Sequence, residues 1–265
     1  PSQERLYNII RNEAALEMEN LTPGSQIHIR RLRRCYIKLL RLASNPSLLL
    51  EDISYSHPDL LAQLIEEGES PKLEYACRRA RELAKEGKKT IIWSSFVSNV
   101  EILSERLQDL GAVYIHGGVD AGSDEEEDSR EWKINEFKNN PNCMVLVANP
   151  AAAGEGISLH KVCLNAIYID RTFNAAHYLQ SVDRIHRLGL EEGEEPNIEI
   201  LISERTIDID VQNSLIRKIN DMMIALNDTS IVPNPIQFEN DVQIGDDMAI
   251  PDDMENIMQH LEDTC

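Results

Sequence analysis

Three side chains near residue 180 have the types and spacing of a site for a polyanionic ligand. Gln180, Arg184 and Arg187 stand at positions i, i+4 and i+7 of the sequence QSVDRIHRLG. On a helix with about 100° of rotation per residue, all three would point within about 60° of arc. Two guanidiniums beside an amide suit the terminal phosphates of a nucleotide, because each guanidinium offers a fork of donors to phosphate oxygens. A solvated basic helix face is the alternative.

A second stretch, NPAAAGEGISL at 149–159, directly follows a predicted strand. Its small residues would let the backbone approach a ligand closely, with the amides of Gly154 and Gly156 and the hydroxyl of Ser158 as donors. The same composition would also suit a turn that only lets a helix pack. The chain lacks GxxxxGK[ST], so this stretch is not a Walker P-loop.

Further positions at predicted junctions of strands and helices could hold the phosphates of a nucleic acid. Ser95 follows one strand, Gly117 follows the next, and Arg130 stands near the start of a helix. Amides, hydroxyls and guanidiniums at such places are suited to phosphate contacts, which carry no base sequence. Capping of a helix by Ser95 or Ser98 is the alternative.

The composition indicates a globular protein of a reducing compartment, cytoplasmic or, in a eukaryote, nuclear. The chain has 265 residues, 42% of them hydrophobic, and no apolar run of membrane-spanning length or secretory signal at its start. Its five cysteines are odd in number, scattered and without CxxC spacing, which argues against a disulfide framework or a zinc site. His160 and His177 lack companions at ligand spacing, so no metal site is expected.

The charge of the chain is strongly negative and unevenly spread. The formal net charge of −20 argues against a general nucleic-acid binder. Basic residues nevertheless gather at 30–34, 78–89 and 184–187, and no Lys or Arg follows Lys218. A local positive groove is therefore compatible with the acidic total.

The pattern of apolar residues predicts a helical segment followed by an α/β domain. Helices are expected at 3–20, at 27–43 and from Pro58 to near Gly68, within a helical lead-in at 1–69. From residue 70 to 226, short apolar strands alternate with helices, which indicates a parallel sheet with helices on both faces and ligand sites at the carboxyl ends of its strands. We predict strands at 90–93, 112–116, 143–148, 165–170 and 198–202, and helices at 72–86, 97–110, 131–138, 175–188 and 207–226.

Two residues are expected to position the helix at 175–188. Asp170 ends a predicted strand, and Asn174 stands where its side chain can cap that helix. Both would fix where Gln180 and the two arginines point.

The last segment, 227–265, has a different composition. It is acidic, contains three prolines and shows little periodicity, so we predict an acidic and partly disordered tail. Within it, 252–262 could form one amphipathic turn or two.

Taken in order, these pieces resemble the C-terminal lobe of the Swi/Snf-like helicases, a branch of the superfamily-two ATPases. The resemblance covers roughly residues 30–207, and the ordered set is specific although each motif alone is weak. The motifs are LRLASNPSLL at 40–49, SPKLEYA at 70–76, KKTIIWSSF at 88–96, HGG at 116–118, REWKINEF at 130–137, NPAAAGEGISL at 149–159 and YIDRTFNAAHYLQSVDRIHRLG at 168–189. Departures at Leu190, at 173–175 and at 153–154 leave the subfamily open.

The resemblance implies a RecA-like lobe that uses ATP with Mg²⁺ together with a second lobe. No Walker motif occurs in the chain, and the only DE pair stands in the acidic run DEEED at 124–128. In this family the Walker and DExx motifs lie on an N-terminal RecA-like lobe, which holds the Mg²⁺. We therefore expect half a motor, as part of a longer enzyme or as one subunit of a split enzyme, without ATPase activity of its own.

The resemblance also implies roles for the residues singled out above. Arg184 and Arg187 would act as arginine fingers, with Gln180 orienting the nucleotide or an arginine. The small-residue loop would line the nucleotide cleft through Gly154, Glu155 and Gly156. One strand of duplex DNA would be held through its phosphates by Ser95, Gly117, Arg130 and Ser158, and opening and closing of the cleft would give translocation.

Two readings compete with this one. The chain could be a non-catalytic module whose acidic tail and helical lead-in bind a partner protein, or a lobe of a restriction or RNA-directed helicase of the same superfamily. The tail could also be autoinhibitory, since its carboxylates could occupy a basic groove; deletion of 227–265 would then raise DNA affinity.

Overall fold

The computed structural model describes residues 2–51, 57–68, 70–119, 128–152, 158–185, 196–226 and 251–262. In this part of the chain, five parallel strands form one sheet in the order β2-β3-β1-β4-β5. The strands are β1 (Thr90–Trp93), β2 (Val113–Ile115), β3 (Val145–Ala148), β4 (Asn165–Tyr168) and β5 (Asn197–Ile200). The predicted parallel sheet is confirmed, and each strand lies within one residue of its predicted range or inside it.

The central strands end at the same level, which creates one continuous carboxyl edge. Trp93 of β1 is in register with Ala148 of β3 and with Tyr168 of β4. All four residues of β1 and of β3 are buried, as expected of parallel strands that are covered on both faces. The loops that follow these strands therefore meet at one edge.

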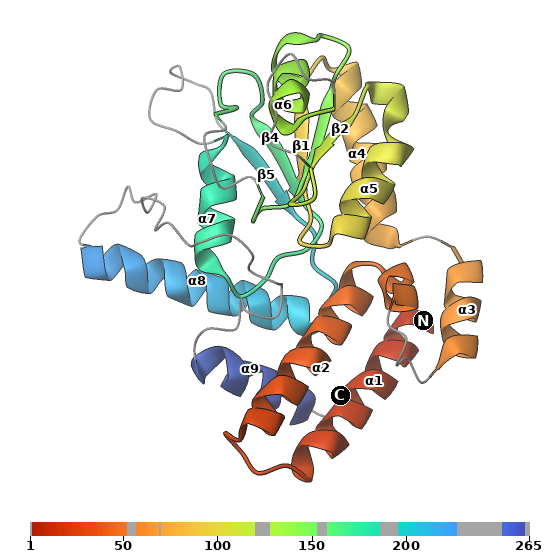
Figure 1. Cartoon of the computed structure of the whole chain (residues 1–265), viewed down its shortest axis with the longest axis vertical. Helices are drawn as coiled ribbons and strands as arrows, with labels where there is room; N and C mark the ends of the chain where they lie inside the picture. The colour runs from red at the N-terminus through yellow and green to blue at the C-terminus, as the bar shows by residue number, and fades with distance from the viewer. Residues whose placement is uncertain are drawn as a thin grey trace.

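Helices cover both faces of the sheet, as predicted. On one face, Ile92 and Ile167 pack with apolar residues of α4 (Pro71–Lys85) and α5 (Val97–Arg106). On the other, Ile91 and Trp93 pack with Phe137 of α6 (Arg130–Asn139) and with the end of α7 (Ala175–Asp183). Alternate residues of β1 thus point to opposite faces. Figure 1 shows α4 and α5 on one side of the strands and α7 on the other.

The predicted helix at 97–110 is interrupted. α5 ends at Arg106, and a short 3₁₀ turn, η2 (Gln108–Leu110), follows it. Gly111 closes this turn with a φ of 63°, and a Cβ added there would lie 2.6 Å from the carbonyl oxygen of Asn142. Both the left-handed backbone and the close approach require glycine at this position.

A second group of helices lies against the carboxyl edge and combines both ends of the chain. It consists of α1 (Ser2–Glu19), α2 (Gln26–Ser44), η1 (Pro46–Glu51), α3 (Pro58–Glu66), α8 (Ile207–Leu226) and α9 (Pro251–Glu262). These elements, with Phe96 and Phe173, share one apolar cluster. Figure 1 shows α9 beside α1 and α2, below the sheet. Within the described residues, no helix has the length and apolarity that a membrane crossing requires.

α9 differs from the prediction for the tail. The sequence suggested one or two turns at 252–262, whereas α9 has 12 residues. Ile257 and Leu261, four residues apart, are both buried in the cluster formed with α1, α2 and α8. Packing across the chain therefore stabilises a helix whose own sequence signal is weak.

Candidate functional site at the carboxyl edge of the sheet

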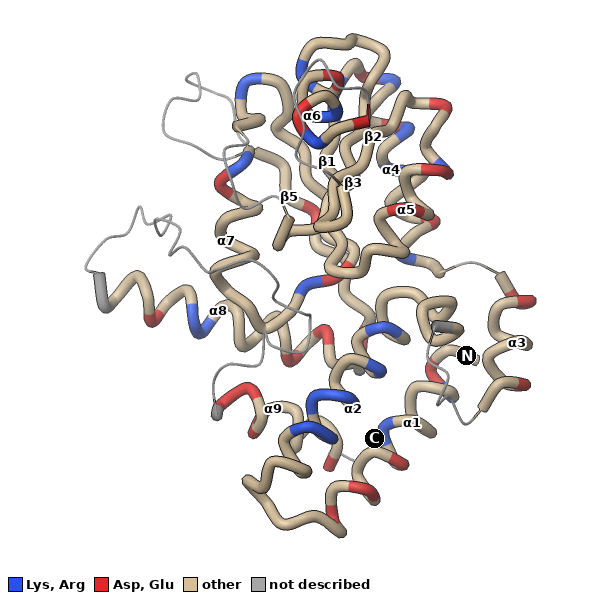
Figure 2. The backbone as a smooth tube through the Cα atoms, in the orientation of Figure 1, with Lys and Arg blue, Asp and Glu red and all other residues tan. Residues whose placement is uncertain are grey.

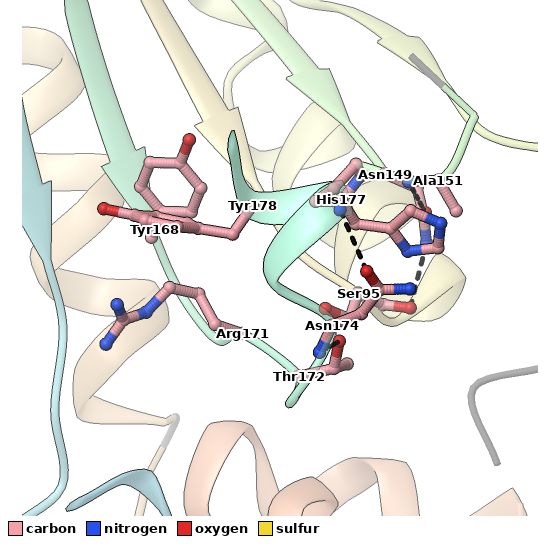
Figure 3. Close-up of a pocket in the computed structure, with 10 residues that line it drawn as sticks. Ser95, Asn149, Ala151, Tyr168, Arg171, Thr172, Asn174, His177 and Tyr178 are labelled. Carbon is pink, nitrogen blue, oxygen red and sulfur yellow. Dashed lines mark hydrogen bonds between the residues drawn. The ribbon is translucent and has the colours of Figure 1, made fainter. Parts of the chain in front are cut away.

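A pocket opens at the carboxyl edge of the sheet, where β1, β3 and β4 end. Ser95 after β1 and 149–151 after β3 form one part of its lining, and the rest comes from Tyr168, 171–172, Asn174 and 177–178. Figure 3 shows Ser95, Asn149 and His177 on one side of the pocket, with Arg171 and Tyr168 on the other. The pocket thus lies where the sequence predicted ligand sites.

Asn149 connects the loops after β1 and β3 with the last residue of β2. Its side-chain amide donates to the carbonyl of Ser95 at 2.9 Å, and its side-chain oxygen accepts from the amide of Ala151 at 2.9 Å. Its own backbone amide donates to the carbonyl of Ile115 at 2.9 Å. This role of Asn149 could not be predicted from the sequence, because nothing in the neighbouring residues shows which loops its amide will reach.

Asp170 is the hydrogen-bonding centre beneath this pocket. The residue is 2% exposed, and its carboxylate accepts from the hydroxyl of Ser94 at 2.7 Å and from the amide of Ser95 at 2.6 Å. It also accepts from the hydroxyl of Ser44, the last residue of α2, at 2.7 Å. One carboxylate therefore joins the ends of β1 and β4 to the end of α2. Asp170 was expected to position the helix at 175–188, and it also holds the loop that contains Ser95.

Asn174 caps α7, as predicted. Its side-chain oxygen accepts from the amide of His177 at 3.1 Å. The amide of Asn174 in turn donates to the hydroxyl of Thr172 at 3.3 Å. The start of the helix that carries Gln180 is therefore fixed to the loop that lines the pocket.

The predicted extent of that helix, 175–188, is wrong at its end. α7 ends at Asp183, and the amides of Arg184 and Ile185 donate to the carbonyls of Ser181 and Val182 in a tight turn. Ile185 is fully buried against the sheet, and the carbonyl of Arg184 accepts from the amide of Leu159 at 2.9 Å. Burial of Ile185 and this bond favour a turn over continuation of the helix.

The proposed finger residues are only partly described. The side chain of Gln180 is partly exposed, whereas Arg184 is only 5% exposed. Arg184 stands in the turn after α7 and not on the helix, and Arg187 lies outside the described residues, so its place beside the other two stays a prediction. A residue on a helix face that binds a ligand would be accessible, whereas Arg184 is buried in this structure.

The small-residue loop leads directly to the turn at Arg184. Gly154, Glu155 and Gly156 lie outside the described residues. Ser158, which follows them, has its hydroxyl 2.8 Å from Nδ1 of His160, and Leu159 makes the backbone bond to Arg184. The two stretches proposed for the nucleotide, at 149–159 and 180–187, are therefore adjacent in space at this point.

The four residues proposed for DNA contact occupy different surroundings. Ser95 lines the pocket and is 8% exposed. Gly117 is exposed just beyond β2, and no described heavy atom lies within 4 Å of a Cβ added there. Arg130 begins α6, and its buried Nε has no hydrogen-bond partner in the described structure. Ser158 lies beside the turn at Arg184. Of these four residues, only Ser95 lines the pocket.

Arg171 is a cation of the pocket that the sequence analysis missed. It is 8% exposed, lies 5.3 Å from the ring centre of Tyr178 and donates a hydrogen bond to Gln212 of α8. Burial lowers the pKa of Arg171 and raises that of Tyr168 beside it. Its position directly after Asp170 was the available signal, but its partner in α8 is 41 residues away.

The described residues fit phosphate better than a divalent cation. They contain no group of three or more His, Cys, Asp or Glu side chains placed to hold a metal ion. The described cysteines, Cys35, Cys77, Cys143 and Cys163, are buried, and none of them forms a disulfide with another. The pocket supplies guanidinium, amide and hydroxyl donors from Arg171, Asn149 and Ser95. This donor set suits the oxygens of a phosphate and offers no carboxylate ligand for Mg²⁺.

Comparison with known families agrees with the motif order. Residues 71–189 match the family described as the helicase conserved C-terminal domain. Among curated relatives, the chain is 33% identical over 129 residues to the "SWI/SNF-related matrix-associated actin-dependent regulator of chromatin subfamily A containing DEAD/H box 1 homolog" of Caenorhabditis elegans. That match covers 48% of this chain and 12% of the relative. The chain spans 7% to 12% of the first curated relatives it matches.

Solved structures show the same fold. The C-terminal domain of the Sulfolobus solfataricus SWI2/SNF2 ATPase matches with a TM-score of 0.59 and 21% identity, covering 82% of this chain and 81% of that domain. The core of that ATPase in complex with dsDNA matches with a TM-score of 0.60 and 22% identity, covering 88% of this chain and 45% of the core. At such identities the likeness concerns the fold.

Proposed function

We propose that this chain is the second motor lobe of a translocase, because residues 71–189 match the helicase conserved C-terminal domain and the fold is that of a SWI2/SNF2 ATPase C-terminal domain. The enzyme would move along double-stranded DNA at the expense of ATP. The backbone bond between Leu159 and Arg184 carries this proposal, because it joins the two stretches suited to phosphate. A similar core whose structure contains dsDNA supports duplex DNA as the track.

In the proposed mechanism, this lobe forms one wall of the nucleotide cleft. ATP with Mg²⁺, whose ligands we expect on the N-terminal lobe, supplies the phosphoryl group that is transferred to water. Arg187 and Arg184 would place positive charge against the terminal phosphates, and Gln180 would hold one of these groups in position. Since Arg184 is 5% exposed, it can touch the phosphates only if its side chain moves when the lobes close.

Substitution of the arginines tests this assignment. In an enzyme that contains both lobes, Arg187→Ala and Arg184→Ala should each lower DNA-stimulated ATP hydrolysis by about 10³-fold or more while duplex binding persists. Arg205→Ala is the matched control, because Arg205 is exposed and pairs at the surface with Glu4. Normal turnover in either variant would remove that arginine from the mechanism. The 265-residue chain alone should show no hydrolysis, and measurable activity would contradict the need for a second lobe.

The DNA contact can be tested at Gly117. This glycine is exposed beyond β2 with open space around its Cα, so a side chain fits there. Gly117→Glu should weaken binding of duplex DNA several-fold by repelling the phosphates, whereas Gly117→Ala should bind normally. Equal binding by both variants would place the DNA elsewhere. A parallel titration with duplex RNA decides between the DNA and RNA readings of this lobe.

A further inference from the structure

α9 is fastened to the rest of the molecule by buried polar groups at each end. At its first turn, Asp253 is fully buried and its carboxylate lies 2.8 Å from the ammonium of Lys218 on α8. The same carboxylate accepts from the hydroxyl of Ser214 at 3.1 Å. At its last turn, His260 lies 2.8 Å from the hydroxyl of Tyr7 and 2.8 Å from the carboxylate of Asp210.

The first of these anchors extends to the candidate site. The ammonium of Lys218 also donates to the carbonyl of Phe173 at 2.7 Å and lies 5.8 Å from the centre of the Phe173 ring. Phe173 is fully buried, and its ring packs 5.2 Å from that of Tyr36 on α2. It immediately precedes Asn174, the cap of α7. One ammonium therefore joins a carboxylate of α9 to the backbone at the start of α7.

This three-part contact is sensitive to the loss of any member. The side chain of Lys218 is 14% exposed and that of Asp253 is 0% exposed, so neither charge is well solvated. Removing one charge of a buried pair leaves the other without compensation in a poorly polar environment. Without the carboxylate of Asp253, solvation by water would stabilise the ammonium of Lys218 better than its buried position does. We therefore expect the ammonium to turn toward water and to release the carbonyl of Phe173.

We propose that Lys218 is a positioning residue of the motor site and that the docking of α9 through Asp253 holds it in place. Lys218 fixes the carbonyl before the cap of α7, and α7 carries Gln180 and leads into the turn at Arg184. The importance of this positioning for hydrolysis rests on the proposed function of those residues. The mechanical link itself does not depend on that function.

The adjacent residue of α9 provides a matched control. Asp252 lies 3.9 Å from Arg217, and the side chains are 63% and 46% exposed. Both aspartates stand in the first turn of α9 and face neighbouring residues of α8. Asp253→Asn and Asp252→Asn therefore remove the same charge from the same helix end, but only the former removes the charge that pairs with Lys218.

Hydrogen exchange of the 265-residue chain tests the link. Asp253→Asn should raise amide exchange in the first turns of α7, at 177–181, by about tenfold or more, while β1 amides exchange as in the wild type. Asp252→Asn should leave α7 unchanged, and Lys218→Arg should retain most of the protection because arginine can reach both acceptors. Unchanged α7 exchange in Asp253→Asn, or an equal rise in β1, would overturn the proposal.

Kinetics of an enzyme with both lobes separate this inference from the proposed function. If the link and the function both hold, Asp253→Asn should lower kcat for DNA-stimulated hydrolysis, with a smaller change in KM for ATP and none in Asp252→Asn. Faster α7 exchange with normal kcat would confirm the link and contradict the role of α7 in hydrolysis. Normal exchange in α7 would contradict the link whatever the kinetics.

Discussion

The carboxylate of Asp170 accepts hydrogen bonds from two other segments of the chain, from Ser44 at the end of α2 and from Ser94 and the amide of Ser95 after β1. An amide at this position keeps the shape but replaces one acceptor oxygen by a donor. That donor would face hydroxyl and amide groups that themselves donate, in a place that is 2% exposed. The residue is therefore intolerant even of a conservative change.

We predict that Asp170→Asn lowers the free energy of unfolding by about 2 to 4 kcal/mol, as expected for buried donors left without a charged acceptor. Urea titration followed by circular dichroism measures this change. Asp221→Asn, an exposed position on α8, is the control and should stay within about 0.5 kcal/mol of the wild type. A near-neutral Asp170→Asn would show that the network rearranges without cost.

Residues whose role is local were predictable from sequence, and residues whose partners are distant were not. Asn174 stands immediately before its own helix, so its role as a cap could be read from the chain. Asn149 and Arg171 reach residues 54 and 41 positions away, and no local pattern specifies such partners. The burial of Arg184 was likewise unpredictable, because it depends on how the segment at 158–159 packs against the turn.

The periodicity of apolar residues predicted which helices and strands exist better than it predicted where each of them ends. The strands and the helices of the lead-in follow from apolar spacing, since each buries one face or both. α7 stops at Asp183 because a tertiary bond from Leu159 and the burial of Ile185 replace its next turn. α9 was underestimated for the opposite reason, because its short apolar face gains its stability only against α1, α2 and α8.

The edge strand β5 is held to α4 by one carboxylate. Glu199 accepts from Arg79 at 2.7 Å and from the hydroxyl of Tyr75 at 2.8 Å. Burial alone would raise the pKa of Glu199, but these hydrogen bonds outweigh burial and hold the pKa below its ordinary value of 4.5. The ionised form is therefore favoured in the folded state.

This shift makes the contribution of Glu199 dependent on pH. An acid with a lowered folded pKa adds stability that is fully present above its unfolded pKa, here near 4.5, and is lost as pH falls through the folded value. We predict that Glu199→Gln costs about 1 kcal/mol at pH 7 and progressively less as pH falls below 4.5, measured by urea unfolding. Glu105→Gln, at an exposed position, should show no such trend. A cost independent of pH would mean that the carboxylate charge is not what joins β5 to α4.

At the scale of the whole molecule, charge is segregated. α2 carries six of the 26 Lys and Arg residues and no carboxylate, although the formal net charge is −20. Figure 2 shows these cations along α2, whose last residue is bonded to Asp170 at the carboxyl edge. Arg30 and Arg34 are exposed and one turn apart, so both side chains project from the same side of the helix.

The docking of α9 also changes how an autoinhibitory tail should be tested. Deletion of 227–265 would remove Ile257, Leu261 and Asp253, which are buried in the helical group, along with the acidic residues. Such a deletion would lower stability as well as charge, so a change in DNA affinity could not be assigned to either. Charge substitutions on the surface avoid this ambiguity because they leave the apolar cluster intact.

If the arginines of α2 contact DNA, substituting them should weaken duplex binding more than an equal change of net charge elsewhere on the surface. We predict that Arg30→Glu with Arg34→Glu weakens duplex binding and reduces the slope of log affinity against log salt by about 2, because each arginine would neutralise one phosphate. Arg78→Glu with Arg205→Glu changes the net charge equally at two exposed residues outside α2 and should alter the slope little. Fluorescence anisotropy across a salt series measures both. If both double variants gave the same slope of log affinity against log salt, α2 would contribute only through the net charge of the molecule and not through direct contacts with DNA.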